Sequence, residues 1–545
     1  MNKLFFMLLS ALPALFQPPK MTADLVIHHA RVYTVDQAFS VTEAIAVKDG
    51  KILATGTSKD ILARYTAKQV VDAHGKFCYP GFIDAHAHFM GYAEGLEQVN
   101  LVGTTSWNDI LSRLRTASGN LEAGHWLRGR GWDQNDWATK EFPTREQLDH
   151  YFPDRPVFLK RVDGHAAIVN NVALNMAGLQ PGMTINGGIV ETKNGKLTGL
   201  LVDNAVGLVE NHIPGTTAAA ITTDIRAAQQ NCFAVGLTTV DDCGIGYEAV
   251  QLIDSLQRAG IMKMKLYAML SDNPKNYRFA RQNGKISSGM LTVRAFKVYA
   301  DGALGSRGAC LLQAYSDKPG WVGFLLSAPA HFDSVAAVIH ALGFQMCTHA
   351  IGDSGNRTIL QTYGRVLHGK NDLRWRIEHA QVVAPADFPL FGQYSIIPSV
   401  QPTHATSDMY WATARLGKTR VKAAYAYRTL LKENGWLPLG TDFPVEDISP
   451  LKTFYAAVVR KDAKGFPAGG FQPENALSGQ QALRGMTTWA AKANFEESEK
   501  GSLEKGKMAD IVILDDDLMT TAPSRLLQIK VISTFVNGVK VYPAK

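Results

Sequence analysis

Apolar and polar side chains alternate near both ends of the chain. Residues 21–80 contain short β-rich runs such as Leu25–His28, and a similar alternation returns close to the C-terminus in Ala509–Leu514. Alternation with a period of two is typical of strands that bury one face. Neither end is long enough to hold a good core by itself. We therefore predict a small β-sandwich domain built from residues 21–80 and 501–545, with two separate β-units as the alternative.

The middle of the chain follows another pattern, in which apolar strand-like runs alternate with longer helical segments. This pattern is typical of a parallel α/β architecture, and eight expected strands favour a (β/α)8 TIM barrel over residues 81–500. The stretch between the first two strands is too long for one crossover. An inserted subdomain is therefore expected at about 98–225, where it could roof the barrel mouth. The expected strands are Gly81–His86, Gly236–Asp241, Met264–Leu270, Arg294–Ala300, Phe344–His349, Trp375–His379, Tyr394–Val400 and Trp436–Thr441.

Length and composition are those of an ordinary globular protein. A chain of 545 residues, 46% of them hydrophobic, fits one barrel with an insertion and one smaller domain. The net charge of +7 is mild and no dense block of Lys and Arg occurs, so nucleic acid is not an expected partner. The five cysteines are scattered without Cys-x-x-Cys spacing, and we expect mostly buried thiols.

The first twenty residues are similar to a signal peptide. Met1–Lys3 forms a short positive segment and Leu4–Phe16 an apolar one, although the nearest cleavage site, at Ala14–Gln17, is poor. The apolar run is too short for a comfortable membrane span. We expect residues 1–20 to direct export, a periplasmic or secreted location, and no membrane span in the mature chain. A cytoplasmic protein whose translation starts at Met21 is the alternative.

Residues with metal-binding potential occur at the ends of several expected strands. His86 and His88 are two positions apart, so on a strand their imidazoles point to the same side and suit a first-row metal such as zinc. Lys297 lies within an apolar strand, where an ammonium is costly unless it is paired or chemically altered. Singly, such residues are explained as hydrogen-bonded core side chains or helix caps, but their recurrence along one barrel rim favours a metal site. Further candidates of this kind are His349, His379 and Asp442.

Several longer motifs carry a resemblance to a known family. They are Pro80–His88, Asp301–Arg307, Glu378–Ala380, Gly440–Pro444 and Gly506–Val512. From about Ala23 onward the sequence resembles the amidohydrolase superfamily of metal-dependent hydrolases. It is most similar to the family 3 branch, which includes N-substituted formamide deformylases.

The resemblance implies a role for each matched position. His86 and His88 would bind the more buried metal together with Asp442, and a second metal would be bound by His349 and His379. Lys297 stands where binuclear members carry a carboxylated lysine that bridges the ions. The implied cofactor is two divalent ions per chain, with zinc expected, and a single-metal site is the alternative.

The implied activity is hydrolysis of a carbon–nitrogen bond in a small non-peptide amide by a metal-activated hydroxide. Asp442 would take the proton of the attacking water and return it to the leaving nitrogen. His165 is our candidate donor to the developing oxyanion, with a structural histidine as the alternative. The inserted segment and the loop after the seventh strand suggest further residues that face the substrate. These are Trp132, Asp133, Trp137 and His404, although a buried structural role is equally open for Trp137.

Two other functions stay open. The first is a deaminase of a cyclic amidine, or a hydrolase of cyclic amides or esters, on the same barrel. Deaminases of this superfamily usually use a Glu near the barrel histidines and lack the bridging lysine, whereas here Ala350–Asp353 follows His349 and Lys297 is present. The second is a non-catalytic binding or regulatory protein. A homodimer is expected only because dimers are the commonest soluble assembly.

Overall fold

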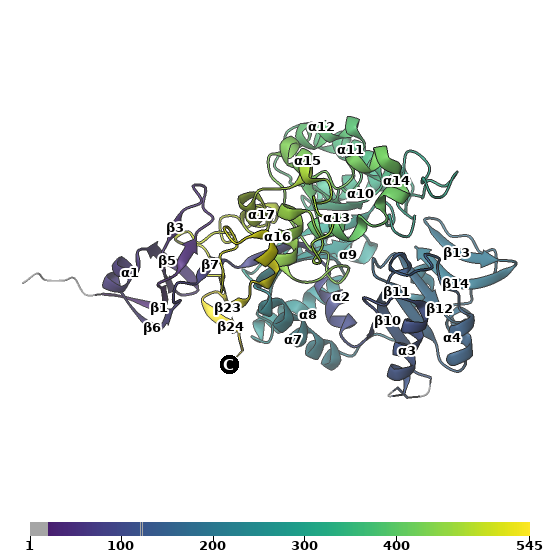
Figure 1. Cartoon of the computed structure of the whole chain (residues 1–545), viewed down its shortest axis with the longest axis horizontal. Coiled ribbons are helices and arrows are strands. Elements are labelled where there is room, and N and C mark those ends of the chain that lie inside the picture. The colour runs from purple at the N-terminus through teal and green to yellow at the C-terminus, as the bar shows by residue number, and fades with distance from the viewer. Residues whose placement is uncertain (1–19, 120, 123, 545) are drawn as a thin grey trace, which may run out of the picture.

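The molecule has three parts that lie in a row. The computed structural model describes residues 20–119, 121–122 and 124–544. A terminal β-sandwich lies at one end, a barrel in the centre and an inserted α/β unit at the other end (Figure 1). The predicted signal peptide at 1–20 lies outside the described residues except for Lys20, so export stays a prediction. Among the described helices, none is both long and apolar enough to cross a lipid bilayer.

The central barrel is built from parallel strands in the order β21-β20-β19-β18-β16-β15-β8, with β17 paired to β18 outside this path. Its strands agree closely with the expected ones, and the predicted fold class is confirmed. Their bounds are β8 Phe82–Ala87, β15 Leu237–Ile245, β16 Lys265–Ser271, β17 Ile286–Ser287, β18 Leu291–Tyr299, β19 Gln345–Ala350, β20 Arg376–His379 and β21 Ile397–Ser399.

An irregular segment closes the barrel where a regular eighth strand was expected at Trp436–Thr441. Leu439 forms an isolated parallel bridge with Val400, and the carbonyl of Leu439 accepts a hydrogen bond from Ala85 N at 3.1 Å. Pro438 has no amide hydrogen to donate, which removes one possible hydrogen bond from this segment. The segment therefore fills the eighth position without being a regular strand.

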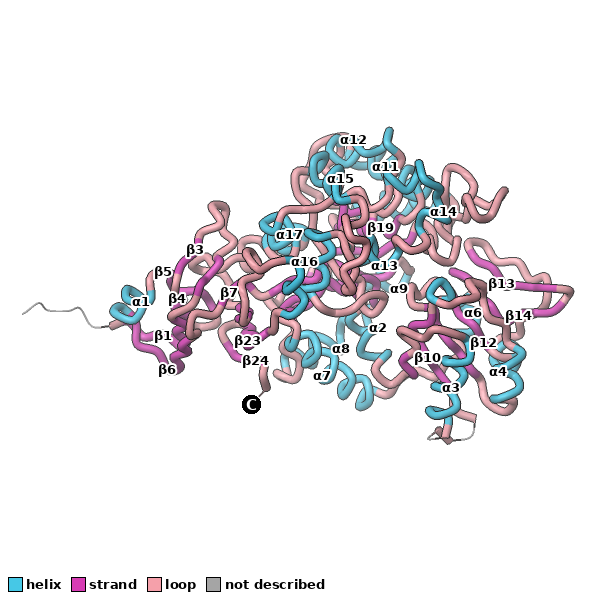
Figure 2. The backbone as a smooth tube through the Cα atoms, viewed as in Figure 1, coloured by secondary structure: helices cyan, strands magenta, loops and turns pink. Residues whose placement is uncertain are grey.

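Helices cover the outside of the barrel (Figure 2). They follow the barrel strands in the βα order expected for this architecture. Their bounds are α2 Phe89–Gly95, α7 Ala218–Ala234, α8 Tyr247–Arg258, α9 Pro274–Asn283, α10 Pro329–Ala341, α11 Asp353–Leu367, α12 Phe388–Gln393, α13 Pro402–Asp408, α14 Ala412–Arg420, α15 Tyr427–Asn434, α16 Pro450–Val459, α17 Gly479–Gly485 and α18 Thr488–Ala493.

The barrel interior is packed with side chains. Cys243, Tyr267, Met269, Ala295 and Cys347 form one buried cluster inside it. All five cysteines have free thiols and four of them are buried, as expected.

The insertion between β8 and β15 carries its own mixed sheet, in the order β13-β14-β12-β11-β10-β9. This unit lies within the predicted insertion at about 98–225, whose boundaries stay a prediction. Its elements are β9 Val99–Asn100, α3 Trp107–Ser118, β10 Leu127–Trp132, α4 Glu146–Tyr151, β11 Val157–Arg161, β12 Ala166–Val169, α5 Asn171–Met176, β13 Gly188–Lys193, β14 Lys196–Asp203 and α6 Val206–Glu210.

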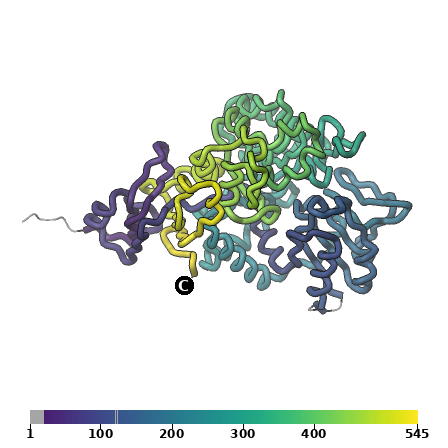
Figure 3. Tube along the Cα trace, in the orientation of Figure 1, coloured from purple at the N-terminus to yellow at the C-terminus, as the bar shows by residue number. Residues whose placement is uncertain are grey.

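Both ends of the chain share one sandwich. One sheet has the order β5-β4-β1-β6 and the other the order β24-β23-β22-β7-β2-β3, so the second sheet combines N-terminal and C-terminal strands (Figure 3). Leu25 and Ile45 of the first sheet pack in one core with Ile511 and Phe535 of the second. The elements are β1 Met21–His28, β2 Arg31–Tyr33, β3 Val41–Thr42, β4 Ala44–Lys48, β5 Lys51–Gly56, α1 Ser58–Arg64, β6 Tyr65–Asp72, β7 Phe77–Pro80, β22 Ile511–Leu514, β23 Val531–Val536 and β24 Val539–Tyr542.

Candidate metal centre and active site

The predicted metal ligands converge at the C-terminal edge of the barrel strands. His86 lies on β8, His349 on β19 and His379 at the end of β20, and Asp442 follows the closing segment. Active sites of barrels of this kind lie at that edge. A cavity of about 240 Å³ opens over them and is lined, among others, by His88, Lys297, His349, His379, His404 and Asp442.

Asp442 lies at the centre of two overlapping ligand groups. In one, ligand atoms of His86, His88 and Asp442 all lie within 4.8 Å of one another. Asp442 Oδ1 is 3.5 Å from His86 Nε2 and 3.2 Å from His88 Nε2. The other group combines His379, His404 and Asp442 within the same limit, and Asp442 Oδ2 is 3.3 Å from His404 Nε2. His404, which we assigned to the substrate, therefore also stands among the candidate ligands.

His349 lies beside this group without joining either set of three. Its ring centroid is 4.6 Å from that of His379, and its Nε2 is 3.9 Å from Asp301 Oδ1. Asp301 accepts hydrogen bonds from the backbone N–H groups of Ile351, Gly352 and Cys310 at 2.8–2.9 Å. Asp301 thereby fixes the loop that follows His349 and holds this histidine at the cavity wall.

The donor atoms of this cluster have the character of a metal site. Four buried atoms of this cluster make no hydrogen bond to any described residue, namely His349 Nε2, His379 Nδ1, His404 Nε2 and Asp442 Oδ1. A buried polar atom without a partner costs about 1–3 kcal/mol. Four such atoms around one cavity are explained if their lone pairs face a cation. Several imidazoles and a carboxylate are donors suited to zinc.

Protonation suits a cation at His86, His379 and Asp442, whereas at His404 burial lowers the pKa but the effect of Asp442 outweighs burial and raises the pKa to about 9. Burial and the neighbouring Lys297 lower the pKa of His86 to about 4. Burial and adjacent histidines hold the pKa of His379 well below its usual value. For Asp442, burial raises the pKa, but His404, His88 and the other nearby imidazoles outweigh it and hold the pKa well below its ordinary value. His86, His379 and Asp442 thus present neutral imidazoles and a carboxylate, the forms that bind metals.

A buried carboxylate orients His86 from behind. Glu378 Oε2 lies 2.6 Å from His86 Nδ1, and both side chains are fully buried. A hydrogen bond from Nδ1–H to this carboxylate leaves the lone pair of Nε2 facing Asp442. Arg376 Nη1 lies 4.0 Å from Glu378 Oε1 and donates to Asp241 at 2.9 Å. We assigned no role to Glu378 from the sequence, although charges at i and i+2 of one barrel strand are a signal that both face the interior.

Lys297 points into the same cluster. Its Nζ lies 3.3 Å from His86 Nε2 and 5.0 Å from the centroid of the Tyr299 ring. Burial disfavours its charge, but Cys243, Tyr299 and nearby carboxylates outweigh this effect and raise its pKa. An unmodified buried lysine is expected to have an anionic partner, and Lys297 has none within ion-pair distance in the described residues.

Backbone contacts explain the sequence around Asp442. A Cβ on Gly440 would lie 2.5 Å from His86 N, so only glycine lets the closing segment pass this close to β8. Asp84 accepts hydrogen bonds from Thr441 N at 2.9 Å and Thr441 Oγ1 at 2.6 Å. Asp442 has a φ of 65° and His379 a φ of 73°, both in the left-handed region. Such strained conformations cluster at functional sites, where surrounding contacts hold them.

The insertion contributes His165 to the cavity. Its Nδ1 lies 2.6 Å from Asp203 Oδ1, and its ring centroid is 5.0 Å from that of His349. Burial lowers the pKa of His165, but Asp203 outweighs burial and raises the pKa above its ordinary value. Since Asp203 engages Nδ1, Nε2 is the ring nitrogen left to serve as a donor.

The other predicted residues of the insertion lie in two different places, one at the cavity wall and two in the core of the insertion. Asp133 lines the cavity and binds Arg161, which also binds Asp163. Trp132 and Trp137 do not line it. They pack in the core of the insertion, where Trp132 Nε1 donates to the carbonyl of Leu159 at 2.8 Å and Trp137 Nε1 donates to a carbonyl at 3.1 Å. A satisfied indole N–H inside an apolar core gives these two residues a packing role in this structure.

Comparisons with known proteins agree with the resemblance seen in the sequence. The profile of the amidohydrolase family, in its family 3 form, matches residues 69–542. Protein LONG AFTER FAR-RED 3 of Arabidopsis thaliana is 32% identical over 98% of this chain and 94% of its own length. N-substituted formamide deformylase of Arthrobacter pascens is 26% identical over 95% of this chain and 98% of its own length.

A solved structure gives the same result for the fold. The crystal structure of an uncharacterized metal-dependent hydrolase from Pyrococcus horikoshii has a TM-score of 0.75 and 26% sequence identity. The match covers 92% of this chain and 99% of that one. The similarity therefore includes the sandwich, the barrel and the insertion together.

Proposed function

The chain belongs to amidohydrolase family 3, and from this premise we propose that it hydrolyses a carbon–nitrogen bond in a small, non-peptide amide with the help of bound divalent metal. The observation that carries the proposal is the set of buried, unpartnered donor atoms around Asp442 at the C-terminal edge of the barrel. Amide hydrolysis needs an activated water, a proton carrier and a donor for the oxyanion. Residues for each of these tasks face the same cavity.

Two ions can be assigned to the donors of this cavity. His86, His88 and Asp442 would hold one, and His349 and His379 the other, with His404 as a further donor next to Asp442. A bound divalent ion supplies Lewis acidity toward a carbonyl and lowers the pKa of water. The proposal that both ions are zinc rests on the preference of imidazole-rich sites with carboxylate for this metal.

The side chains of the protein perform the remaining steps. The Asp442 carboxylate takes a proton from the attacking water and returns it to the leaving nitrogen, so the carbon–nitrogen bond breaks to give an acid and a free amine. His165 donates from Nε2 to the carbonyl oxygen as it becomes anionic, with Asp203 fixing the ring. Glu378 keeps His86 in the tautomer that presents Nε2 to the cluster.

The cavity wall suggests which substrates fit. Asp136, Asp408 and Glu446 line it, and no Arg or Lys lies within ion-pair distance of Asp408 or Glu446 in the described structure. Burial raises the pKa of Asp408 to about 7 and also raises the pKa of Glu446. An ammonium or N–H group on the substrate would give these buried carboxyl groups a partner. A carboxylate on the substrate would instead place a like charge beside them. We therefore propose neutral or cationic amides as substrates.

The test uses matched N-formyl and N-acetyl amines whose distal group is an ammonium, a methyl or a carboxylate. We expect amine release that is lost on chelation and restored by zinc, with kcat/KM at least about tenfold higher for the ammonium than for the carboxylate substrate. Glu446→Gln is expected to narrow that difference. Ammonia release from a cyclic amidine, without turnover of any acyclic amide, would contradict the proposal and favour a deaminase.

Lys297 is proposed to be carboxylated, since its amine would combine with carbon dioxide to give a carbamate and a proton. This change replaces a buried ammonium by an anionic oxygen ligand between the two ion sites. Lys297→Ala should lower the metal content and the activity, and short-chain carboxylates should partly restore both. Lys265, which is equally buried but paired with Asp510 at 2.6 Å, is the internal control for modification by mass analysis. Unmodified Lys297 in active, metal-loaded protein would leave a one-metal mechanism.

A further inference from the structure

A second group of histidines lies far from the barrel cavity, in the terminal sandwich. His28 ends β1 and Asp72 ends β6, and these two residues are direct partners in the parallel pairing of the two strands. His29 follows His28, and His74 lies two residues beyond Asp72. The strand register therefore gathers three imidazoles and one carboxylate at one edge of the sheet.

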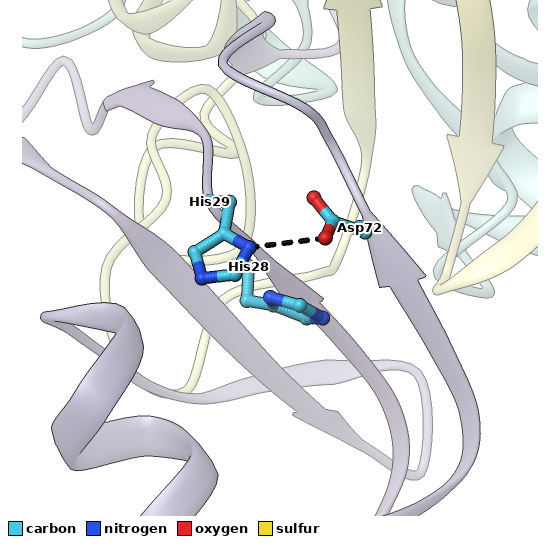
Figure 4. Close-up of side chains that lie close together, drawn as sticks. All are labelled: His28, His29 and Asp72. Carbon is cyan, nitrogen blue, oxygen red and sulfur yellow. Dashed lines mark hydrogen bonds and ion pairs between the residues drawn. The ribbon is translucent and has the colours of Figure 1, made fainter.

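The donor atoms of this group lie close together. One ligand atom from each of His28, His29 and Asp72 falls within 4.8 Å of the others. His29 Nδ1 is 3.0 Å from Asp72 Oδ2, while the ring of His28 lies beside them with its centroid 4.4 Å from that of His29 (Figure 4). His74 Nδ1 lies 3.5 Å from the other carboxylate oxygen, Asp72 Oδ1.

Backbone contacts hold the two connections in place without a ligand. His29 has a φ of 50° and His74 a φ of 49°, both in the left-handed region. Asp72 Oδ1 accepts from His74 N at 2.8 Å, and the carbonyl of His29 accepts from Gly75 N at 2.7 Å. The two turns are thus hydrogen-bonded to each other, so the backbone that carries these imidazoles is held in place.

One ring nitrogen of the group has no hydrogen-bond partner among the described residues. His28 Nδ1 is buried and makes no hydrogen bond to any described residue. A simple His29–Asp72 hydrogen bond explains two of the side chains but leaves this buried nitrogen unexplained, and such atoms normally have a partner. A cation placed between His28 and the His29–Asp72 pair gives the nitrogen one.

We propose that His28, His29 and Asp72 form a peripheral site for a first-row divalent metal. Two imidazoles with one carboxylate suit zinc or copper. The ligands come from the ends of β1 and β6, so a bound ion would join these two strands at their C-terminal ends and stabilise the sandwich. The site is independent of the proposed hydrolysis, because none of its residues lines the barrel cavity.

The test counts bound ions on the full chain by equilibrium dialysis against increasing free zinc. Wild type is expected to bind one ion per chain more than His28→Ala/His29→Ala at saturation, while hydrolase activity stays unchanged. His331→Ala is the matched control, because His331 forms an ordinary exposed pair with Asp272 at 2.7 Å and belongs to none of the candidate metal groups in the described residues. This control is expected to bind as many ions as wild type.

Asp72→Asn is the second variant, chosen because asparagine can still accept the hydrogen bond from His74 N. If the double histidine variant is unstable, Asp72→Asn can replace it, and hydrolase activity retained by Asp72→Asn would show that its fold is intact. We expect this variant to lose the same ion. Once zinc has filled the barrel site, further zinc should raise the Tm of wild type but not that of Asp72→Asn. Ion counts equal to wild type in both Asp72→Asn and the double histidine variant would overturn the proposal. Equal loss in His331→Ala would show nonspecific surface binding and overturn it too.

Discussion

His86→Ala combined with His88→Ala is expected to remove the ion held beside Asp442 and to reduce hydrolysis to the background rate. The two imidazoles and the carboxylate form one of the ligand groups, so the double change leaves Asp442 alone among its three donors. Loss of a single residue behind a ligand typically costs about 10–100-fold in metal affinity or activity. Loss of two direct donors should cost far more, because the water then lacks its activating cation.

Two further variants make this result interpretable. His86 is fully buried against Glu378, so its removal also strands a buried carboxylate and can lower stability. His88→Ala alone avoids this problem, since the side chain of His88 is 28% exposed. Glu378→Gln keeps both imidazoles and should give an intermediate loss of about 10–100-fold.

Metal analysis, far-UV circular dichroism and kcat/KM together separate these cases. We expect folded His88→Ala protein with reduced metal content and little activity. Full metal content with wild-type turnover in the double variant would mean that the ions are bound by other residues.

Most of the fold was predictable because buried parallel strands leave a strong apolar pattern. Runs such as Phe344–His349 and Trp375–His379 became strands within one residue at each end. The closing segment differs because its pairing with the strand before it is reduced to a single bridge, and the hydrogen bonds that close a barrel cannot be inferred from the apolar pattern alone.

The candidate site was predictable to the extent that it depends on strand ends. Residues such as His349 and Asp442 were selected because parallel strands bring their C-terminal ends to one edge, and the structure brings them to one cavity. Glu378 was missed because its role depends on His86, which lies 292 residues away in the chain. The glycine-rich sequence around Trp132 suggests a loop, whereas Gly129 lies close to Leu101 and Leu159 inside the insertion, and Trp132 packs in that core. Trp137 packs in the same core, which is the buried role that the sequence left open for it.

Asp442→Asn is expected to give a folded protein with very little turnover. Asparagine has nearly the same shape, and it tolerates the left-handed backbone that Asp442 adopts at a φ of 65° better than most residues. The hydrogen bond from Asp442 N to the His86 carbonyl, 2.7 Å long, is independent of the side chain and should persist. The barrel and part of the metal content are therefore expected to survive.

The amide of asparagine cannot take a proton from water or return it to a leaving amine. General acid–base catalysis is typically worth about 10²–10⁴-fold. The carboxylate also lies within 3.5 Å of three imidazoles, so its loss weakens both ligand groups at once. We therefore expect kcat to fall by about 10⁴-fold or more.

Asp408→Asn makes the same chemical change in the same cavity and is the matched control. Asp408 accepts a hydrogen bond from the Tyr425 hydroxyl at 2.8 Å and belongs to neither ligand group around Asp442. Its replacement should change KM more than kcat, since a wall residue affects substrate binding rather than proton transfer. Steady-state kinetics on metal-loaded protein measures both effects. Near-normal kcat in Asp442→Asn would mean that another group carries the proton, and His165, which lines the cavity beside His349, is then the first residue to replace.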